Sequence, residues 1–217
     1  MSLSLKATND GSFTLFNDEL NETYHSIHGA RQEGEHVFIE YGLDKMEDLA
    51  KVNILEIGLG TGLNALLTFQ NRKDTQITYY GLEPFPISFD LLSSIIEKNA
   101  KDDEEKRLWV DFMTTDTPSE SSQGFNFYKI IQNIQNFEAP CKFDLVYFDA
   151  FAPNKQPEMW NVAVFERIYT MCASDARLVT YCAQGQFKRN LKSAGFTVYT
   201  APGPPGKREM TVGIREN

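Results

Sequence analysis

The stretch that decides the fold is VNILEIGLGTGLNALLTFQNR, Val52–Arg72. It opens with the continuous apolar run VNILEIG, which is typical of a strand buried on both faces of a sheet. Three closely spaced glycines follow, and the chain then continues in the short helical pattern NALLTFQNR. A buried strand, a glycine-rich turn and a helix make up the first part of a β-α-β unit. The stretch therefore predicts a parallel sheet with helices packed on it.

The same alternation continues to the C-terminus. Further strands are predicted at QITYYGLE, FDLVYFDA and RLVTYCA, and helices at SFDLLSSIIEKNA, PEMWNVAVFERIYTMCA and GQFKRNLKSAGF. The last two extended runs, TVYTAP and EMTVGIRE, are joined by GPPGKR and predict an antiparallel hairpin. We therefore predict an α/β fold with a mostly parallel, doubly wound sheet and a terminal antiparallel hairpin. This is the Rossmann-like arrangement of class I S-adenosylmethionine (SAM) methyltransferases.

Residues 1–50 differ in pattern from the rest and predict a small β-rich cap, with residues 51–217 forming the methyltransferase domain. The segment KATNDGSFTLFND predicts a hairpin, because Asp10-Gly11 is a strong signal for a tight turn. The run HVFIEYGL predicts another short extended segment.

Length and composition indicate one ordinary globular domain with its own core: 217 residues, 41% hydrophobic and 24% charged. No apolar run is long enough to span a bilayer, and MSLSLKATNDGS lacks the apolar core of a signal peptide, so a cytoplasmic location is expected. The cysteines are odd in number and form no CxxC pair, which predicts free thiols and no metal site. The histidines, likewise without metal-ligand spacing, are expected at the surface: His25, His28 and His36.

Charge is unevenly distributed along the chain. The net charge of −9 argues against a polyanionic partner, yet residues 151–217 hold nine Lys/Arg against five Asp/Glu. Residues 1–150 hold twelve against twenty-five. The basic C-terminal part suits a contact with an anion, and ordinary solvated faces are the alternative.

Ligands of doubly wound sheets bind beyond the carboxyl ends of the strands. At the first strand end, Gly58, Gly60 and Gly62 permit positive φ and close approach of a ligand to the backbone. Their GxGxG spacing differs from the GxGxxG of dinucleotide sites, and a purely structural turn is the alternative. Glu56, just before the turn, is placed to meet the ammonium of a methionine moiety. That carboxylate favours SAM over a pyrophosphate ligand.

The second and third strand ends supply two further candidates. Glu83 follows Gly62 by twenty-one residues, about the interval at which an acidic residue accepts hydrogen bonds from ribose hydroxyls. The alternative is an exposed strand-end glutamate. Within NFYKIIQNIQNF, Asn133 is the nearest polar candidate for an adenine contact, and it equally fits a loop residue.

The fourth strand ends at Asp149, and here four ordered segments resemble one family. The segments GLGTGLN, DAFAPNKQPEMW, AGF and GKREM resemble the methyltransferases that complete the 5-methylaminomethyl side chain of the tRNA wobble uridine. The resemblance runs from about Thr14 to Ile214. It implies that Thr61 and Asn64 of GLGTGLN bind SAM with the residues above. The family's acidic residue on the adenine side has no counterpart in YKIIQNIQ.

In many bacteria this activity is one half of a bifunctional protein, whose FAD-dependent half removes a carboxymethyl group from the wobble base. This sequence has no GxGxxG fingerprint and no room for that half. It therefore resembles the stand-alone methylating form. The resemblance implies that a separate enzyme supplies the aminomethyl-uridine precursor.

The reaction implied by the resemblance joins the methyl group of SAM to the exocyclic amine of 5-aminomethyl(-2-thio)uridine in the tRNA anticodon loop. An alkyl ammonium has a pKa of roughly 10, so a group must remove its proton. Asp149 fits that role, and Pro153 and Pro157 stiffen the loop behind it. A turn-forming aspartate is the alternative.

The same resemblance implies substrate contacts. Phe151 is expected to stack on the unstacked uridine, since aromatic side chains commonly read single-stranded RNA. Tyr24 in the cap is expected to line the cofactor or substrate pocket, and Lys207 and Arg208 to contact phosphates. Phe151 and Trp160 equally fit core positions.

Two other functions fit the fold. Spermidine synthases also attack a sulfonium with an amine and place an Asp at the same strand end. They typically carry a second acidic residue three positions on, where this chain has Ala152. A SAM-binding module without enzymatic activity would leave Asp149 unexplained.

Overall fold

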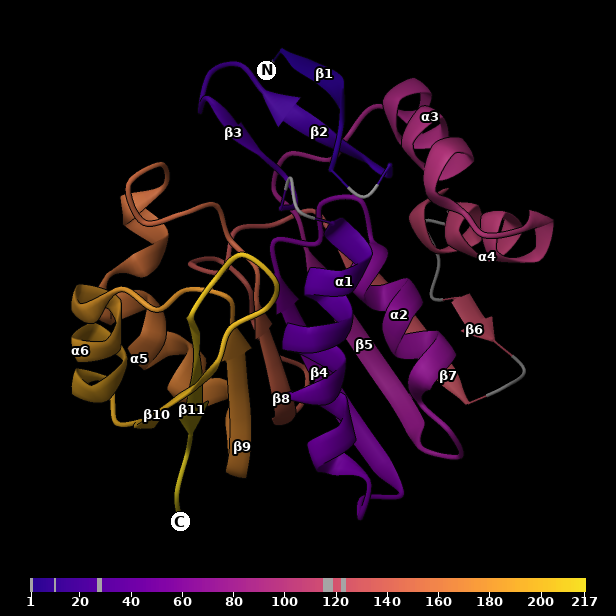
Figure 1. Cartoon of the computed structure of the whole chain (residues 1–217). Helices are drawn as coiled ribbons and strands as arrows, with labels where there is room; N and C mark the ends of the chain where they lie inside the picture. The colour runs from indigo at the N-terminus through magenta and orange to yellow at the C-terminus, as the bar shows by residue number, and fades with distance from the viewer. Residues whose placement is uncertain (1, 10, 27–28, 115–118, 122–123) are drawn as a thin grey trace.

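The computed structural model describes residues 2–9, 11–26, 29–114, 119–121 and 124–217. Within these ranges an eight-stranded sheet is covered by helices on both faces, and a three-stranded sheet lies above one end of it (Figure 1). The strand order of the large sheet is β10-β11-β9-β8-β4-β5-β7-β6. The predicted doubly wound architecture is confirmed.

The elements have the following bounds. The large sheet contains β4 Lys51–Ile57, β5 Gln76–Leu82, β6 Ser119–Ser121, β7 Phe125–Ile130, β8 Phe143–Phe148, β9 Cys172–Thr180, β10 Thr197–Pro202 and β11 Glu209–Ile214. The helices are α1 Ala30–Gly34, α2 Leu63–Asn71, α3 Phe89–Asn99, α4 Asp103–Thr114, α5 Val162–Met171 and α6 Gly185–Ser193. The small sheet contains β1 Leu3–Ala7, β2 Phe13–Asn17 and β3 Glu22–Thr23.

Strand directions follow the predicted pattern. The pairs β9–β8, β8–β4, β4–β5 and β5–β7 are all parallel. At one edge β11 runs antiparallel to both β9 and β10, which confirms the terminal hairpin. At the other edge the short β6 pairs antiparallel with β7 and was not predicted. Helix α4 was not predicted as a separate element either.

Each face of the large sheet has its own aromatic core. On one face α4 buries Trp109 and Phe112, and the Trp109 Nε1–H donates to the Thr61 carbonyl oxygen (2.7 Å). On the other face α5 and α6 bury Phe165 and Phe187. Truncating one such aromatic to alanine typically costs about 3–5 kcal/mol. Both cores are therefore expected to contribute strongly to the stability of the fold.

The N-terminal region agrees with its prediction only in part. The hairpin is confirmed by the antiparallel pairing of Ala7 with Phe13, whereas Asp10 lies outside the described residues. The predicted extended run HVFIEYGL was wrong: Glu35–Glu40 is a π-helical segment that continues α1. Its consecutive side chains Val37, Phe38 and Ile39 are all buried, so the run has the apolar content of a strand without its alternation. The division of the chain at residue 50 stays a prediction.

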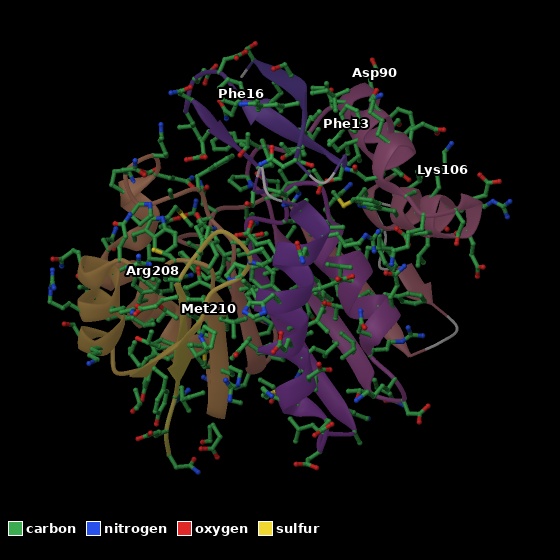
Figure 2. All side chains as sticks on the ribbon, viewed as in Figure 1. Phe13, Phe16, Asp90, Lys106, Arg208 and Met210 are labelled. Carbon is green, nitrogen blue, oxygen red and sulfur yellow. The ribbon has the colours of Figure 1, made fainter. Side chains whose placement is uncertain are left out.

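Hydrogen bonds on two sides of the small sheet connect it to the rest of the protein. Asn99 at the end of α3 donates from Nδ2 to the Phe13 carbonyl oxygen (2.7 Å) and accepts at Oδ1 from the Phe13 N–H (2.8 Å). Figure 2 shows Phe13 on the side of β2 that faces α3. On the opposite side the Lys155 ammonium donates to the Asn21 carbonyl oxygen (3.1 Å). The cap thus covers the carboxyl ends of the central strands.

The predicted helix from Pro157 is divided in two. Pro157–Trp160 forms a 3-10 turn, and α5 begins only after Asn161, whose Oδ1 accepts from the Val164 N–H (3.0 Å). An asparagine side chain satisfies an otherwise unpaired N–H at a helix start, which explains the break. None of the helices in the described ranges combines the length and apolarity that crossing a membrane requires.

Candidate functional site

A cavity of about 760 Å³ lies beneath the cap, at the carboxyl ends of the central strands. Its volume is in the usual range for a small-molecule site. Residues that follow β4, β5, β7, β8 and β9 form its wall, together with the segment after β2. Among the predicted site residues, those on this wall are Tyr24, Gly58, Gly60, Glu83, Asn133, Asp149, Phe151 and Lys207.

Glycine at position 58 brings two strand ends together. Gly58 has φ of +89°, and a Cβ there would lie 2.4 Å from the Asp149 carbonyl oxygen. Only glycine therefore lets the end of β4 approach the end of β8 this closely. Gly62 has a different role, since a Cβ there would meet the Met113 sulfur at 2.3 Å, away from the cavity wall.

The Glu83 carboxylate has a fixed orientation on the wall. Its Oε2 accepts from the Gly60 N–H and its Oε1 from the Phe85 N–H, each at 3.0 Å. Burial raises the pKa of Glu83, and these two donors oppose the shift. Each oxygen keeps a free lone pair, so the carboxylate can accept further hydrogen bonds from a ligand in the cavity.

Glu56 lies behind the cavity wall. It is fully buried, accepting at Oε1 from Asn64 Nδ2 and at Oε2 from the Tyr79 hydroxyl, both at 2.8 Å. The pKa of Glu56 is raised well above its ordinary value by burial and then by the charge of Asp149. Direct contact with a ligand ammonium, as the sequence predicted, does not match this position. The side chain instead orients Asn64.

Asn64 connects Glu56 to Asp149. Its Nδ2 group also donates to Asp149 Oδ2 (2.9 Å), so one amide holds both carboxylates. Asn64 and Thr61 are nearly fully buried and absent from the wall, although both were predicted to bind cofactor. Thr61 Oγ1 lies 2.9 Å from His25 Nε2, and His25 is on the wall rather than on the outer surface as predicted.

Asp149 combines a fixed position with an unusual acidity. Its N–H donates to the Ile57 carbonyl oxygen (2.9 Å), and the residue lines the cavity. Burial raises the pKa of Asp149 to about 7, and the charge of Glu33 adds to the rise, whereas Asn64 and Lys207 oppose it. A carboxyl group with such a pKa can exchange a proton at neutral pH. Asp144, at the start of the same strand, only accepts from the Asn53 N–H (2.8 Å).

Two aromatic side chains meet on the wall. Tyr24 and Phe151 pack edge to face, with ring centroids 5.1 Å apart and an interplanar angle of 81°. Trp160 is instead a core residue, and its Nε1–H donates to the Phe151 carbonyl oxygen (2.7 Å). Phe151 was predicted either to stack on the uridine or to lie in the core, and its place on the cavity wall favours the first.

Lys207 and Arg208 have different environments. The Lys207 ammonium pairs with Glu33 and lies 3.9 Å from the centre of the Tyr181 ring, inside the cavity wall. Arg208 is exposed on the connection between β10 and β11, whereas Met210 is buried (Figure 2). Glu33, Tyr181 and His25 were not predicted as site residues.

Comparisons with known proteins agree with this geometry. Residues 116–216 match the model of the S-adenosyl-L-methionine-dependent methyltransferase family. The chain is 30% identical over 210 residues to the tRNA 5-methylaminomethyl-2-thiouridine biosynthesis bifunctional protein of Campylobacter hominis, covering 90% of this chain and 30% of that protein. It is 27% identical over 224 residues to the protein of the same name from Leptospira interrogans, covering 93% of this chain and 34% of that protein. The chain thus spans about a third of these relatives.

Solved structures show the same fold. MnmC2 from Aquifex aeolicus superposes with a TM-score of 0.79 at 23% identity, over 98% of this chain and 70% of that one. Spermidine synthase from Thermotoga maritima superposes with a TM-score of 0.59 at 13% identity, over 98% and 68%.

The sheet topology and the glycine turn at the first strand end are those of the SAM-dependent methyltransferase fold. Over residues 116–216 the chain is similar to the family of that name. Its sequence relatives are MnmC bifunctional proteins, to which it is similar over about a third of their length.

Proposed function

We propose that the protein uses SAM to methylate the exocyclic amine of 5-aminomethyl(-2-thio)uridine at the wobble position of tRNA. The names of its sequence relatives support this substrate. The observation that carries the proposal is Asp149: a carboxyl group on the cavity wall whose pKa is raised to about 7. Amine methylation requires a group that takes a proton near neutral pH.

The cavity residues fit SAM, which supplies an activated methyl group on its sulfonium. Gly58 and Gly60 leave bare backbone on the wall, where a Cβ would obstruct Asp149 or Tyr24. The fixed Glu83 carboxylate would accept hydrogen bonds from the ribose hydroxyls, and Asn133 would face the adenine. Glu56, Thr61, Gly62 and Asn64 would support this wall from behind.

Glu83→Gln is expected to weaken cofactor binding about tenfold, because hydrogen bonds to charged groups contribute roughly 1.5–3 kcal/mol. The neutral amide also has a single acceptor oxygen, so it cannot serve the Gly60 and Phe85 N–H groups in the same way. Calorimetric titration with S-adenosylhomocysteine measures the effect. Unchanged affinity would remove Glu83 from the proposed ribose site.

Charge on the wall suits a cationic substrate. Six carboxylates line the described part of the cavity, and Lys207 is its single Lys or Arg: Glu19, Glu22, Glu33, Glu83, Asp149 and Glu158. An alkyl amine with a pKa of roughly 10 arrives as an ammonium and is attracted to such a wall. Asp149 would then accept one proton, which leaves a lone pair on the nitrogen. Phe151 and Tyr24 offer ring faces and edges for the uridine.

A tRNA substrate implies partners beyond the cavity. The exposed Arg208 would contact phosphates of the anticodon loop, a role that the position of Lys207 does not favour. A separate enzyme would supply the aminomethyl-uridine precursor, and the reaction would take place in the cytoplasm.

The direct test offers the purified protein labelled SAM with tRNA that carries 5-aminomethyluridine. We expect label in the wobble nucleoside, identified by chromatography of the digested tRNA. A parallel reaction with labelled decarboxylated SAM and putrescine tests aminopropyl transfer, because spermidine synthase shares the fold. Labelled spermidine without labelled tRNA would replace the proposed function with the polyamine one.

A further inference from the structure

Glu33 has a carboxylate on the cavity wall and no assigned role in the proposed reaction. It projects from α1, and its side chain is 13% exposed. Its Oε2 accepts from the Ser26 N–H (3.1 Å), and its neighbour Gly34 packs tightly against Leu67 and Asn64 of α2. The Ser26 N–H therefore orients the Glu33 carboxylate, while Gly34 packs α1 against α2, the helix whose Asn64 donates to Asp149.

The ammonium of Lys207 lies between Glu33 and an aromatic ring. It pairs with Glu33 Oε1 and lies 3.9 Å from the centre of the Tyr181 ring. The Tyr181 hydroxyl donates to the Ala150 carbonyl oxygen (2.8 Å), which fixes that ring beside the Asp149 segment. A carboxylate and the face of an aromatic ring are the groups by which proteins recognise an ammonium. The Glu33 carboxylate and the Tyr181 ring around Lys207 therefore form a site that can bind an ammonium group.

That place is within electrostatic reach of Asp149. The charge of Glu33 raises the pKa of Asp149, and the charge of Lys207 lowers it. The Lys207 ammonium pairs with Glu33 and acts on Asp149 through its charge, so a second cation between these two carboxylates would be attracted to both. Lys207 is also 34% exposed and belongs to the connection between β10 and β11, so its long side chain has solvent into which to move.

We propose that Glu33 and the ring of Tyr181 form an ammonium subsite beside Asp149, which Lys207 occupies in the free protein and the substrate amine takes over. This inference rests on the proposed function and adds to it the group that selects an amine. The substrate ammonium would lie between Glu33 and Asp149. One proton would pass from its nitrogen to Asp149, while Glu33 keeps its charge.

The first test compares Glu33→Gln with Glu35→Gln, a matched change two residues along at an exposed position off the cavity wall. Methylation of tRNA carrying 5-aminomethyluridine and binding of S-adenosylhomocysteine are measured for both. For Glu33→Gln we expect KM for the tRNA to rise about 10- to 100-fold, as for loss of a charged hydrogen bond. Cofactor affinity stays within about twofold, and Glu35→Gln matches wild type in both.

The outcomes separate the two proposals. No methyl transfer by wild type defeats the proposed function and the inference with it. An active wild type with an unchanged KM in Glu33→Gln overturns the ammonium subsite alone. A loss of cofactor affinity as large as the loss of tRNA affinity also overturns it, because a general collapse of the wall then explains both.

The second test uses Lys207→Met, which removes the competing ammonium while keeping a similar length. We expect KM for the tRNA to fall, by about threefold or more, because the substrate no longer displaces an ion pair of modest strength. An unchanged KM would contradict the proposal that Lys207 occupies the ammonium subsite in the free protein. A raised KM with a weaker salt dependence also overturns it and assigns Lys207 to phosphate.

The pH dependence of kcat/KM distinguishes the proposed subsite from a purely structural role of Glu33 and Lys207, because a structural role would not shift its acid limb. The groups facing Asp149 from neighbouring elements are Glu33, Glu56, Tyr79, Tyr181 and Lys207. The acid limb of kcat/KM is expected to shift to lower pH in Glu33→Gln, which loses a negative charge. It is expected to shift to higher pH in Lys207→Met, which loses a positive one. Shifts in the same direction contradict the proposal.

Discussion

Asp149→Asn is expected to lower kcat for methylation of the wobble amine by about 100- to 10,000-fold, the usual contribution of a positioned general base. The new side chain has nearly the same shape, so the hydrogen bond from Asn64 can persist at its amide oxygen. It cannot accept a proton from the substrate ammonium. Single-turnover rates with saturating SAM measure the loss. Binding of S-adenosylhomocysteine should stay close to wild type, because the backbone turn and Glu83 are untouched.

The pH dependence identifies the group that is lost. Because burial raises the pKa of Asp149 to about 7, the active ionised form decreases as pH falls through neutrality. Wild-type kcat/KM should therefore drop on the acid side of about pH 7, and the residual rate of Asp149→Asn should lack this limb. Asp144→Asn, on the same strand but away from the cavity, serves as the control. Full turnover by Asp149→Asn would exclude the proposed base.

Strand ends are the part of the site that could be predicted from the sequence. Periodicity located β4, β5 and β8, and ligands of doubly wound sheets bind where such strands end. That rule makes Glu83 and Asp149 candidates, and the structure brings both to one cavity. Local signals suffice here because each residue immediately follows the buried strand that positions it.

Glu33 shows what the sequence could not supply. Its ion pair with Lys207 joins residues 174 positions apart, and no motif links them. The segment that carries it also continues into the π-helix of Glu35–Glu40, whose apolar run predicts a strand. The contact depends on how the cap folds over the sheet, which short-range patterns do not encode. The cap half of the cavity was for that reason predicted only through Tyr24.

Glu56 was predicted from its place before the glycine turn, and its side chain lies behind the cavity wall. A carboxylate before a glycine turn suits a ligand ammonium, yet the side chain turns into the core and meets Asn64 and Tyr79. A strand residue points to one face or the other of the sheet, and alternation cannot identify the face in a strand buried on both sides. We propose that Glu56 instead supports Asp149 through Asn64.

Gly58→Ala is expected to destabilise the fold by about 2–5 kcal/mol, the sum of left-handed strain and overlap in a packed region. The added Cβ would lie 2.4 Å from the carbonyl oxygen of Asp149, an atom that cannot move without shifting the end of β8. Thermal unfolding followed by circular dichroism measures the cost. The protein that remains folded should also methylate slowly, because the displaced backbone belongs to the proposed base.

Gly124→Ala separates the two causes of this cost. Gly124 has φ of +75°, close to that of Gly58, but among the described residues a Cβ there would meet only ordinary contacts with Gln76 at 3.6 Å and beyond. It should therefore lose only the conformational part, about 1–2 kcal/mol, and keep full turnover. Equal losses in both variants would show that the backbone angle alone matters. A larger loss in Gly58→Ala, accompanied by slow turnover, would show that the glycine is needed because two strand ends must meet there for Asp149 to face the cavity.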